Sequence, residues 1–419
     1  MMKKILLFLV LISSVSVSYA GGYRVSTQGQ RALAMGHTGV AVVNNAELAF
    51  FNPAGLVYLE NKINISAGVT GVISNISWQN TQTGEHIAAD NPFSTPFYLY
   101  ASYRATDWLT LGLSVYTPYG STVEYPTDWS GSHLVNTIDL QAIYIQPVVS
   151  LKLSEYFSVG GGPIFVTGGV KFNRNLNRTL TDEEGNRSNV EIDASGVNGW
   201  GWSAGFMFNP TEDFRLGFHY RSEIILEEES GEAVFSNVPN SPLAPVQNGK
   251  VAFGAKMPMP AEITVGLSYQ FTDKWLFAFD YNRALWSAYS SLDINFAPEE
   301  YPDSINPRNY KNASTYRLGL QYQAMDNLTL RAGWYYDETP VQSGYFAPET
   351  PRNDSQGYTG GLSYQITPRI AIDAAFTYLH FKEVEESYDH YQENGQEVTF
   401  EGLYKSNAFL PGLGVTINL

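Results

Sequence analysis

Segments in which apolar and polar residues alternate one by one recur along most of this chain. In FRLGFHYRS at 214–222, the aromatic and aliphatic residues take the even positions, and Arg, Gly and His take the odd ones. The stretches EITVGLSYQF at 262–271, TYRLGLQYQ at 315–323 and GYTGGLSYQI at 357–366 repeat the pattern. Because successive side chains of a β-strand point to opposite faces, each stretch predicts a strand with one apolar face. Such strands suit a membrane barrel with lipid outside and a wet lumen inside.

The connections between the predicted strands are alternately short and long. The short, polar ones lie at 105–107, 153–155, 209–213, 271–274, 324–327 and 366–369. The long, acidic or proline-rich ones lie near 77–94, 118–134, 174–191, 227–259, 296–311, 338–354 and 385–404. These connections join fourteen strands, and we expect short turns on the periplasmic side and long loops outside. The last strand, at 408–419, carries the Gly414-x-x-Ile417-x-Leu419 spacing of a barrel-assembly signal.

Composition supports an exported β-protein. Residues 1–20 have two lysines, an apolar run and a Ser18-Tyr19-Ala20 ending, which predicts a signal peptide and a mature chain that begins at Gly21. The excess of 41 acidic over 25 basic residues argues against nucleic acid as a partner. Cysteine is absent, aromatic residues reach 14%, and no membrane helix is predicted. An outer-membrane β-barrel fits this combination, and a secreted β-sandwich is the alternative.

Residues 21–60 do not alternate. They contain short helical pieces broken by Gly36, Gly39 and Pro53, and they end in AELAFFNPAGLVYLE at 46–60. Pro53 suits the first position of a helical turn that Asn52 can cap. About 40 residues are too few to bury a core alone, so this segment must pack against the barrel. We therefore expect a signal peptide at 1–20, a hatch that plugs the lumen at 21–60 and a transmembrane barrel at 61–419.

Patterns that would indicate chemistry are weak in this sequence. GWSAG at 201–205 matches a nucleophile elbow, but it lies inside a predicted strand, where Ser203 has no turn to expose it. The six histidines are scattered without metal-ligand spacing. The acidic stretches at 181–193 and 383–397 could bind Ca²⁺, directly or as bridges to lipopolysaccharide, although solvated loop charge is the favoured interpretation. We expect no catalytic residues, no metal and no cofactor.

Several blocks of the chain resemble a known family. They are the mature start GGYRVSTQGQRALAMGHTGVAVVNNAELAFFNPAGL with its Asn52-Pro53-Ala54 motif, and the internal segments at 115–125, 196–224, 259–287 and 328–341. Together they resemble the FadL/TodX family of outer-membrane transporters for long-chain fatty acids and other hydrophobic molecules. The resemblance covers the whole mature chain.

The resemblance implies a fourteen-stranded antiparallel barrel with an N-terminal helical hatch. Hydrophobic cargo would be captured near the outer loops and leave passively through a side exit at a kink in the third strand. That strand is about 107–117 here, and Gly112 is the residue that could tolerate a bend. The protein would be a multi-pass monomer of the outer membrane, with hydrophobic small molecules, membrane lipid and lipopolysaccharide as its partners.

Candidate cargo contacts follow from the predicted inward faces. Arg215, Arg221, Arg317 and Arg331 could each bind a ligand carboxylate, although barrel arginines more often pair with acidic residues. Leu379 and Phe381 could line the path or pack the hatch. Fatty acids, aromatic hydrocarbons and other lipids all fit as cargo. A porin-like or structural barrel without hydrophobic cargo, and an outer-membrane lipase or protease, are the alternatives.

Overall fold

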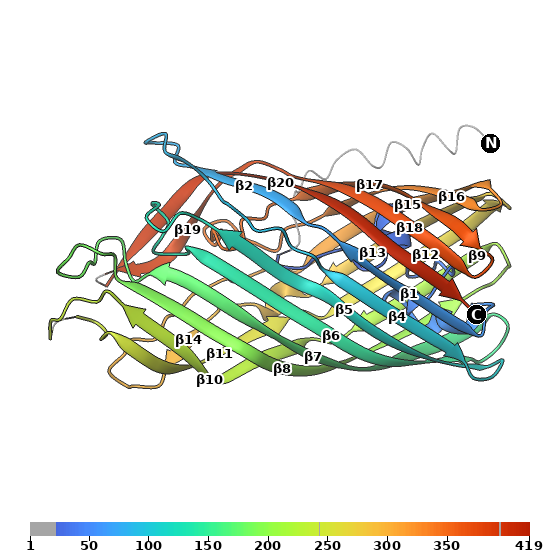
Figure 1. The fold of residues 1–419 in the computed structure, drawn as a ribbon, viewed down its shortest axis with the longest axis horizontal. Helices are drawn as coiled ribbons and strands as arrows, with labels where there is room; N and C mark the ends of the chain where they lie inside the picture. Colours follow the sequence, from blue (N-terminus) through green and yellow to red (C-terminus); the bar gives the residue numbers. More distant parts are fainter. Residues whose placement is uncertain (1–21, 243, 394) are drawn as a thin grey trace.

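The computed structural model describes residues 22–242, 244–393 and 395–419, and the expected signal peptide at 1–20 lies outside them. The described chain forms a closed antiparallel β-barrel (Figure 1). The first strand pairs with the last, with Ser66 opposite Thr416, and this contact closes the sheet. The expected all-β barrel is therefore confirmed.

The bounds of the elements follow the alternation seen in the sequence. The helical elements are α2 (Gln30–Ala34), α3 (Leu48–Phe51) and the 3-10 helices η1 (Pro53–Tyr58) and η2 (Trp286–Ala288). The strands are β1 (Ile63–Thr70), β2 (Ile73–Gln79), β3 (His86–Ala88), β4 (Phe97–Arg104), β5 (Leu109–Glu124), β6 (Thr137–Lys152), β7 (Phe157–Asn175), β8 (Asn189–Phe208), β9 (Phe214–Arg221), β10 (Ile224–Ser236), β11 (Gly249–Met259), β12 (Glu262–Thr272), β13 (Trp275–Ala284), β14 (Ile294–Phe296), β15 (Ala313–Met325), β16 (Leu328–Asp337), β17 (Ser355–Thr367), β18 (Ile370–Phe381), β19 (Val384–Glu393) and β20 (Gln396–Asn418).

The strand elements of the described residues make fourteen crossings of the barrel wall, as the sequence predicts. Six elements continue the crossing begun by the element before them, namely β2, β4, β10, β12, β14 and β19. The faces also agree with the prediction. In β15, Tyr316 and Leu318 are exposed on the outer face, whereas Arg317 between them is buried. None of the described helices is both long and apolar enough to cross a bilayer.

The prediction of a long loop is wrong in two places, because much of each segment forms strands. Residues 227–259 belong largely to the hairpin β10–β11, and residues 385–404 belong to the hairpin β19–β20. These strands extend past the apolar band, where their outward side chains are charged. Lys256 lies 2.6 Å from its cross-strand partner Glu227, for example. The acidic composition suggested loops. Here the acidic residues lie instead on strands that are longer than the roughly 9–11 residues that a bilayer needs.

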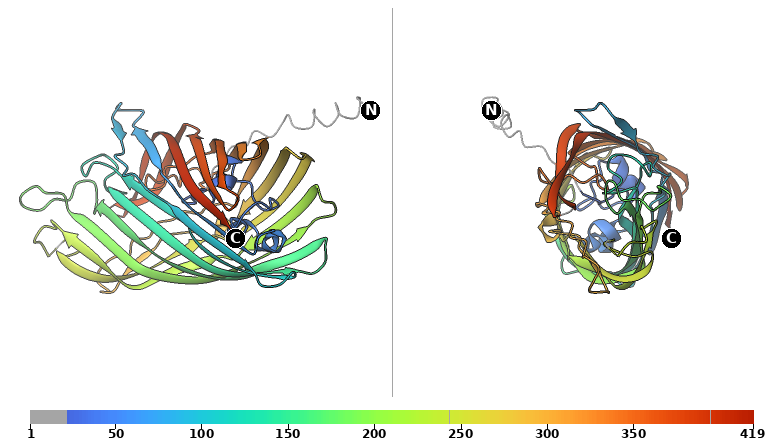
Figure 2. Two further views of the ribbon diagram at one scale, coloured as in Figure 1. Left: turned by 45° about the vertical axis from the view of Figure 1, so that its right-hand side comes forward. Right: turned by 90° about the vertical axis from the view of Figure 1, so that its left-hand side faces the viewer.

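The segment 22–60, called the N-terminal segment below, lies inside the barrel (Figure 2). Buried polar contacts fix it to the wall. Arg31 in α2 forms a 2.9 Å ion pair with Asp373 of β18. The carboxylate of Asp280 in β13 accepts hydrogen bonds from the backbone N–H groups of Gly39 and Val40, at 2.8 and 3.1 Å. Backbone groups that would otherwise be unpaired inside the barrel thus find partners on the wall.

Candidate functional site

A large apolar cavity, called the outer cavity below, lies between the barrel wall and the long loops. Its empty volume is about 1160 Å³, a figure that includes open solvent at its mouth. Its apolar lining comes from β6, β7, β8, β10, β11 and β14 and the loops beside them: Leu134, Ile138, Leu140, Val170, Phe172, Ile192, Ala194, Val197, Leu226, Phe253, Ala255, Met257, Leu292 and Ile294. A space with this lining can bury apolar surface of a hydrophobic chain or ring.

Two arginines line the polar part of the outer cavity, and one of them is neutralised. Arg308 forms a buried ion pair with Glu349 and donates a 3.0 Å hydrogen bond to the hydroxyl of Tyr388. Burial alone would lower the pKa of the Arg308 guanidinium, but Glu349 and Tyr388 raise that pKa above its ordinary value. This guanidinium is therefore charged and already satisfied by a carboxylate.

Arg174, at the end of β7, is the second arginine, and its partners are neutral. It donates to the carbonyl oxygen of His133 at 2.9 Å and to the hydroxyl of Ser304 at 3.2 Å. Among the residues that the structure describes, Arg174 forms these contacts with neutral groups and no ion pair within 4.0 Å. An uncompensated cation beside an apolar cavity can receive a carboxylate.

The barrel wall is interrupted next to β5 (Figure 1). The pairing of β4 with β5 ends at Tyr98 and Tyr116. The register between β5 and β6 shifts between Tyr116 and Tyr119, where Pro118 lacks the N–H that a regular ladder requires. From residue 117 to 123, no described strand pairs with β5 on the β4 side. Along this stretch, β5 therefore lacks a strand neighbour on the β4 side.

The start of the N-terminal segment covers that interruption from inside. Arg24 forms an isolated antiparallel bridge with Tyr119. On either side of the bridge, Val25 donates its N–H to the carbonyl of Pro118 at 2.8 Å, and Gly120 donates to the carbonyl of Tyr23 at 3.1 Å. Residues 23–25 therefore occupy the place that the missing part of β4 leaves free.

The register irregularity of the third strand, β5, lies beyond Gly112. Gly112 pairs with Ser102 of β4 and Val148 of β6, in regular register on both sides. A glycine tolerates a bend but does not require one. The missing donor of Pro118 breaks the ladder directly, so the irregularity lies at 117–118 instead.

A second, smaller cavity, called the inner cavity below, lies between the N-terminal segment and the wall. It encloses about 400 Å³ of unfilled space and is mostly polar. Its lining consists of Arg24, Val25, Ser26, Gln28, His37, Val40, Phe50, Phe51, Pro118, His219, Arg221, Glu262, Thr264, Asn282 and Arg317. Because Pro118 belongs to this lining, the inner cavity adjoins the interrupted wall.

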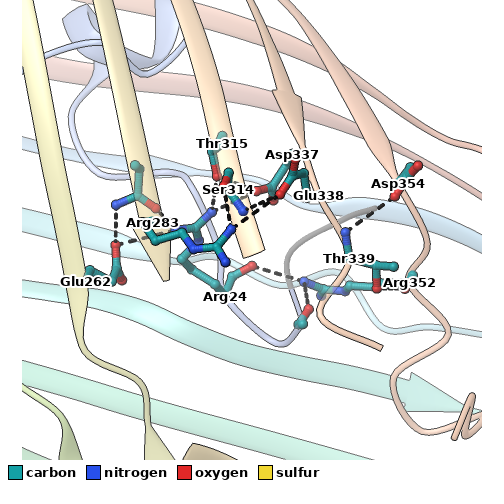
Figure 3. A network of polar contacts seen from close by, with 12 residues as sticks. Arg24, Glu262, Arg283, Ser314, Thr315, Asp337, Glu338, Thr339, Arg352 and Asp354 are labelled. Atoms are coloured by element: carbon teal, nitrogen blue, oxygen red, sulfur yellow. Dashed lines mark hydrogen bonds and ion pairs between the residues drawn. The ribbon is translucent and has the colours of Figure 1, made fainter. Parts of the chain in front are cut away.

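Residues 23–25 are called the leading residues below. Arg24 anchors them beside the inner cavity (Figure 3). One side-chain nitrogen donates to Asn282 at 2.5 Å and lies 3.4 Å from Glu262. The other donates to Thr315 at 2.6 Å and pairs with Asp337 at 2.8 Å. A residue of the N-terminal segment is thus held by side chains from β12, β13, β15 and β16.

The structure brings two of the four predicted arginines together. Arg221 and Arg317 both line the inner cavity, whereas Arg215 and Arg331 line neither cavity. Arg331 instead donates to Gln321 and Ser363, at 2.9 and 2.5 Å.

The two predicted apolar lining residues lie away from both cavities. Leu379 and Phe381 share the register of the buried Asp373 in β18, but they line neither the outer nor the inner cavity. The outer cavity is built from the opposite side of the barrel, on β6–β8 and β10–β11.

The Asn52-Pro53-Ala54 motif starts η1, with Pro53 at its first turn. The side-chain oxygen of Asn52 accepts from the N–H of Ala54 at 3.3 Å, so the predicted cap is present. The amide nitrogen of Asn52 also donates to the carbonyls of Val40 and Phe206, at 2.9 and 3.0 Å. Asn52 therefore joins two parts of the N-terminal segment to strand β8.

Sequence reasoning did not single out Arg174 as part of the outer cavity, because residues 174–191 were predicted to be a long acidic loop. One signal was available: Val170, Phe172 and Arg174 have the same parity, so the arginine continues an inward apolar row. Arg308 and Glu349 come from two distant loops, and no local pattern joins them.

The nucleophile-elbow motif around Ser203 forms part of a regular strand. Ser203 lies in the middle of β8, and its hydroxyl accepts a 2.6 Å hydrogen bond from Gln146. Within the described ranges, no group of three His, Cys, Asp or Glu side chains could hold a metal ion.

The closed barrel, its occupied lumen, its apolar cavity and its interrupted wall define an outer-membrane transport barrel. Residues 10–419 match the family described as outer membrane protein transport protein (OMPP1/FadL/TodX). The chain belongs to this family. It is therefore an outer-membrane transport protein and not an enzyme.

Relatives and solved structures agree with this assignment. The chain is 26% identical to outer membrane protein P1 of Haemophilus influenzae, over 86% of each chain. It is 22% identical to the long-chain fatty acid transport protein of Escherichia coli K12, over 90% of this chain and 91% of the relative. Its fold resembles a Pseudomonas aeruginosa FadL homologue with a TM-score of 0.81 at 20% identity, covering 95% and 100% of the two chains. The Pseudomonas putida toluene transporter TodX gives a TM-score of 0.74 at 19% identity, covering 96% and 99%.

Proposed function

We propose that this protein carries hydrophobic molecules, foremost long-chain fatty acids, passively across the outer membrane. The observation that supports this most is the outer cavity, where an apolar lining meets one cation, Arg174, without a carboxylate partner. One relative is named a long-chain fatty acid transport protein, and a similar structure is a toluene transporter. A cavity with an apolar body and one cation that lacks a carboxylate partner favours an amphipathic acid over a plain hydrocarbon.

The physical need for such a carrier arises outside the hydrocarbon core. A hydrophobic molecule is opposed by the polar saccharide layer, not by the lipid tails. Burial in the outer cavity removes its apolar surface from water, at about 25 cal/mol per Å². A charge-assisted hydrogen bond from Arg174 would orient the carboxylate. The cargo is then shielded across the layer that it cannot cross alone.

We further propose that residues 21–60 act as a plug and that cargo leaves sideways next to β5. The exit is the wall interruption at residues 117–123, and the leading residues 23–25 cover it. For release, those residues would move away from Pro118, and the cargo would pass into the membrane. The alternative is a plugged, porin-like barrel without hydrophobic cargo, for which a large apolar cavity has no use.

The decisive experiment compares an acid with the matching alcohol. Binding of dodecanoic acid and of dodecanol to the purified protein is measured by calorimetry. The variants are Arg174→Gln and, as a matched control, Arg283→Gln, an arginine that lines neither cavity. We expect Arg174→Gln to weaken acid binding roughly tenfold, as for one hydrogen bond to a charged group, and to leave alcohol binding unchanged.

Two outcomes would contradict the proposal. If the wild-type protein binds neither ligand, the outer cavity does not serve hydrophobic cargo. If acid binding is equally strong in all three proteins, Arg174 is not the carboxylate partner. Lipid extraction of the purified protein, followed by mass spectrometry, independently tests which molecules co-purify.

A further inference from the structure

The leading residues have two backbone edges, and β5 occupies one of them. The N–H of Val25 and the carbonyl of Tyr23 pair with β5. Because successive carbonyls of an extended chain point in opposite directions, the carbonyls of Gly22 and Arg24 point away from β5. Arg352, from the loop before β17, lies along this second edge and donates to these two carbonyls at 3.3 and 3.1 Å (Figure 3). This guanidinium, called the Arg352 clamp below, holds the edge that β5 leaves free.

The backbone of Arg352 belongs to a short and stiff piece of chain, APETPR at 347–352. Its two prolines each fix one φ angle. The N–H of Thr350 donates to the carbonyl of Ala347 at 3.2 Å, and the N–H of Arg352 donates to the carbonyl of Thr350 at 2.7 Å. A piece of chain held in this way moves as a unit, so a displacement near its start reaches Arg352. It is called the 347–352 segment below.

The 347–352 segment also lines the outer cavity, through Glu349 and Thr350. The carboxylate of Glu349 forms the buried ion pair with Arg308. The hydroxyl of Thr350 lies 3.1 Å from the hydroxyl of Tyr310. Two residues separate Glu349 from Arg352 in the sequence. The contacts with the outer cavity and the contacts with the leading residues are therefore made by the same stiff piece of chain.

We propose that the 347–352 segment couples the outer cavity to the leading residues, with Arg352 as the positioning residue. In the closed state, Glu349 pairs with Arg308 and the Arg352 clamp is in place. A cargo carboxylate that Arg174 has drawn into the cavity can replace Glu349 on Arg308, so the buried guanidinium stays paired while the segment is released. The carboxylate binds Arg308 in the released state alone, and this difference in affinity shifts the equilibrium toward release. The carboxylate as trigger rests on the proposed function, whereas the clamp does not.

Amide hydrogen exchange, read by mass spectrometry, tests the clamp without any cargo. In Arg352→Gln the leading residues lose the hydrogen bonds from a charged donor, so exchange over residues 22–26 and 117–121 should become roughly tenfold faster. Arg352→Lys keeps a cation and should retain part of the protection. Arg178→Gln is the matched control, because Arg178 is an outer-loop arginine that pairs with Glu393, and it should exchange there like the wild type. Unchanged exchange in Arg352→Gln overturns the proposal.

A double-mutant cycle tests the coupling itself. Glu349→Gln weakens the contact of the 347–352 segment with Arg308 and should also speed exchange of the leading residues. The double variant Glu349→Gln/Arg352→Gln should exchange no faster than Arg352→Gln alone, because the clamp is already absent. If the two effects multiply instead, the positions act independently and the coupling is overturned. Exchange over β1, measured in the same digest, corrects for any loosening of the whole barrel.

Cargo provides the last readout. Saturating dodecanoic acid should speed exchange of the leading residues in the wild type and add nothing in Arg352→Gln. Equal acceleration by dodecanol contradicts the replacement of Glu349 by a carboxylate. Acid that binds in calorimetry without speeding this exchange contradicts the coupling and leaves the proposed function intact. If calorimetry detects no acid binding, the proposed function fails, and the double-mutant cycle still decides the coupling.

Discussion

The backbone N–H of Val25 donates a 2.8 Å hydrogen bond to the carbonyl oxygen of Pro118. This contact joins the start of the N-terminal segment to the point where the ladder of β5 is broken. The neighbouring residues Arg24 and Tyr119 form a bridge of the kind in which facing Cα atoms are about 4.5 Å apart. That separation lies within the range that a disulfide spans.

A disulfide between positions 24 and 119 should therefore hold the leading residues on β5. The double variant Arg24→Cys/Tyr119→Cys is made in a chain that has no cysteine of its own. If release requires the leading residues to move, the oxidised protein should lose uptake of a radiolabelled fatty acid, and a reductant should restore it. The two single variants control for the loss of the Arg24 and Tyr119 side chains. Equal uptake before and after reduction would argue against this exit.

Removing the charge of Asp373 should loosen the N-terminal segment. In Asp373→Asn, Arg31 loses its 2.9 Å ion pair and remains buried inside the barrel. Breaking a buried pair at one partner costs about 3 kcal/mol or more. We expect a lower guanidinium midpoint in unfolding followed by tryptophan fluorescence. Glu227→Gln, which breaks the exposed pair with Lys256, should cost less than about 1 kcal/mol. Equal midpoints for the two variants would show that the buried pair does not stabilise the protein.

Asn52→Ala should destabilise η1 locally. The substitution removes the cap on Ala54 and leaves the carbonyls of Val40 and Phe206 without the Asn52 donor. A cost of about 2 kcal/mol is expected, which corresponds to roughly thirtyfold faster amide exchange over residues 54–58. Hydrogen exchange with peptide-level mass spectrometry measures this. Unchanged exchange there, with full folding of the barrel, would show that Asn52 is dispensable for the turn.

Acid should open the loop that carries His133. Burial, with help from Arg174 and Arg178, lowers the pKa of His133 to about 4. The unfolded loop binds a proton near pH 6.5, so stability is lost as the pH falls from about 6.5 towards 4 and changes little below that. The total cost approaches about 3 kcal/mol. Amide hydrogen exchange over residues 131–136, corrected for intrinsic rates, should therefore be faster at pH 4.5 than at pH 6.5. His133→Gln should remove this pH dependence. An identical pH response in the wild type and in this variant would contradict the role of His133.

The wall of the barrel was predictable from the sequence, because lipid and lumen impose opposite demands on neighbouring residues. Arg221 and Arg317 fall on the inward face for this reason, and the structure shows both buried. The hairpins β10–β11 and β19–β20 were not predictable in the same way. Their outward positions face water above the membrane, so charged residues such as Glu227 and Lys256 replace the apolar signal.

The site was less accessible to sequence reasoning, because its contacts join distant segments. Arg174, Ser304 and the backbone of His133 come from β7 and from two separate loops. The strand interruption could have been found from Pro118, whose missing N–H is a local property. Gly112 only tolerates a bend, whereas the missing N–H of Pro118 interrupts the ladder directly.

The hydrogen bonds of the leading residues with β5 also bear on how often the wall can open. Moving residues 23–25 away leaves the carbonyl of Pro118 and the N–H of Gly120 facing lipid or cargo. Each backbone group without a partner in a hydrocarbon setting costs several kcal/mol. If cargo leaves by the proposed exit, the open state should consequently be a rare and short-lived member of the ensemble. Release of cargo through this wall would then be limited by how often the open state forms, and the barrel could stay sealed to ions in between.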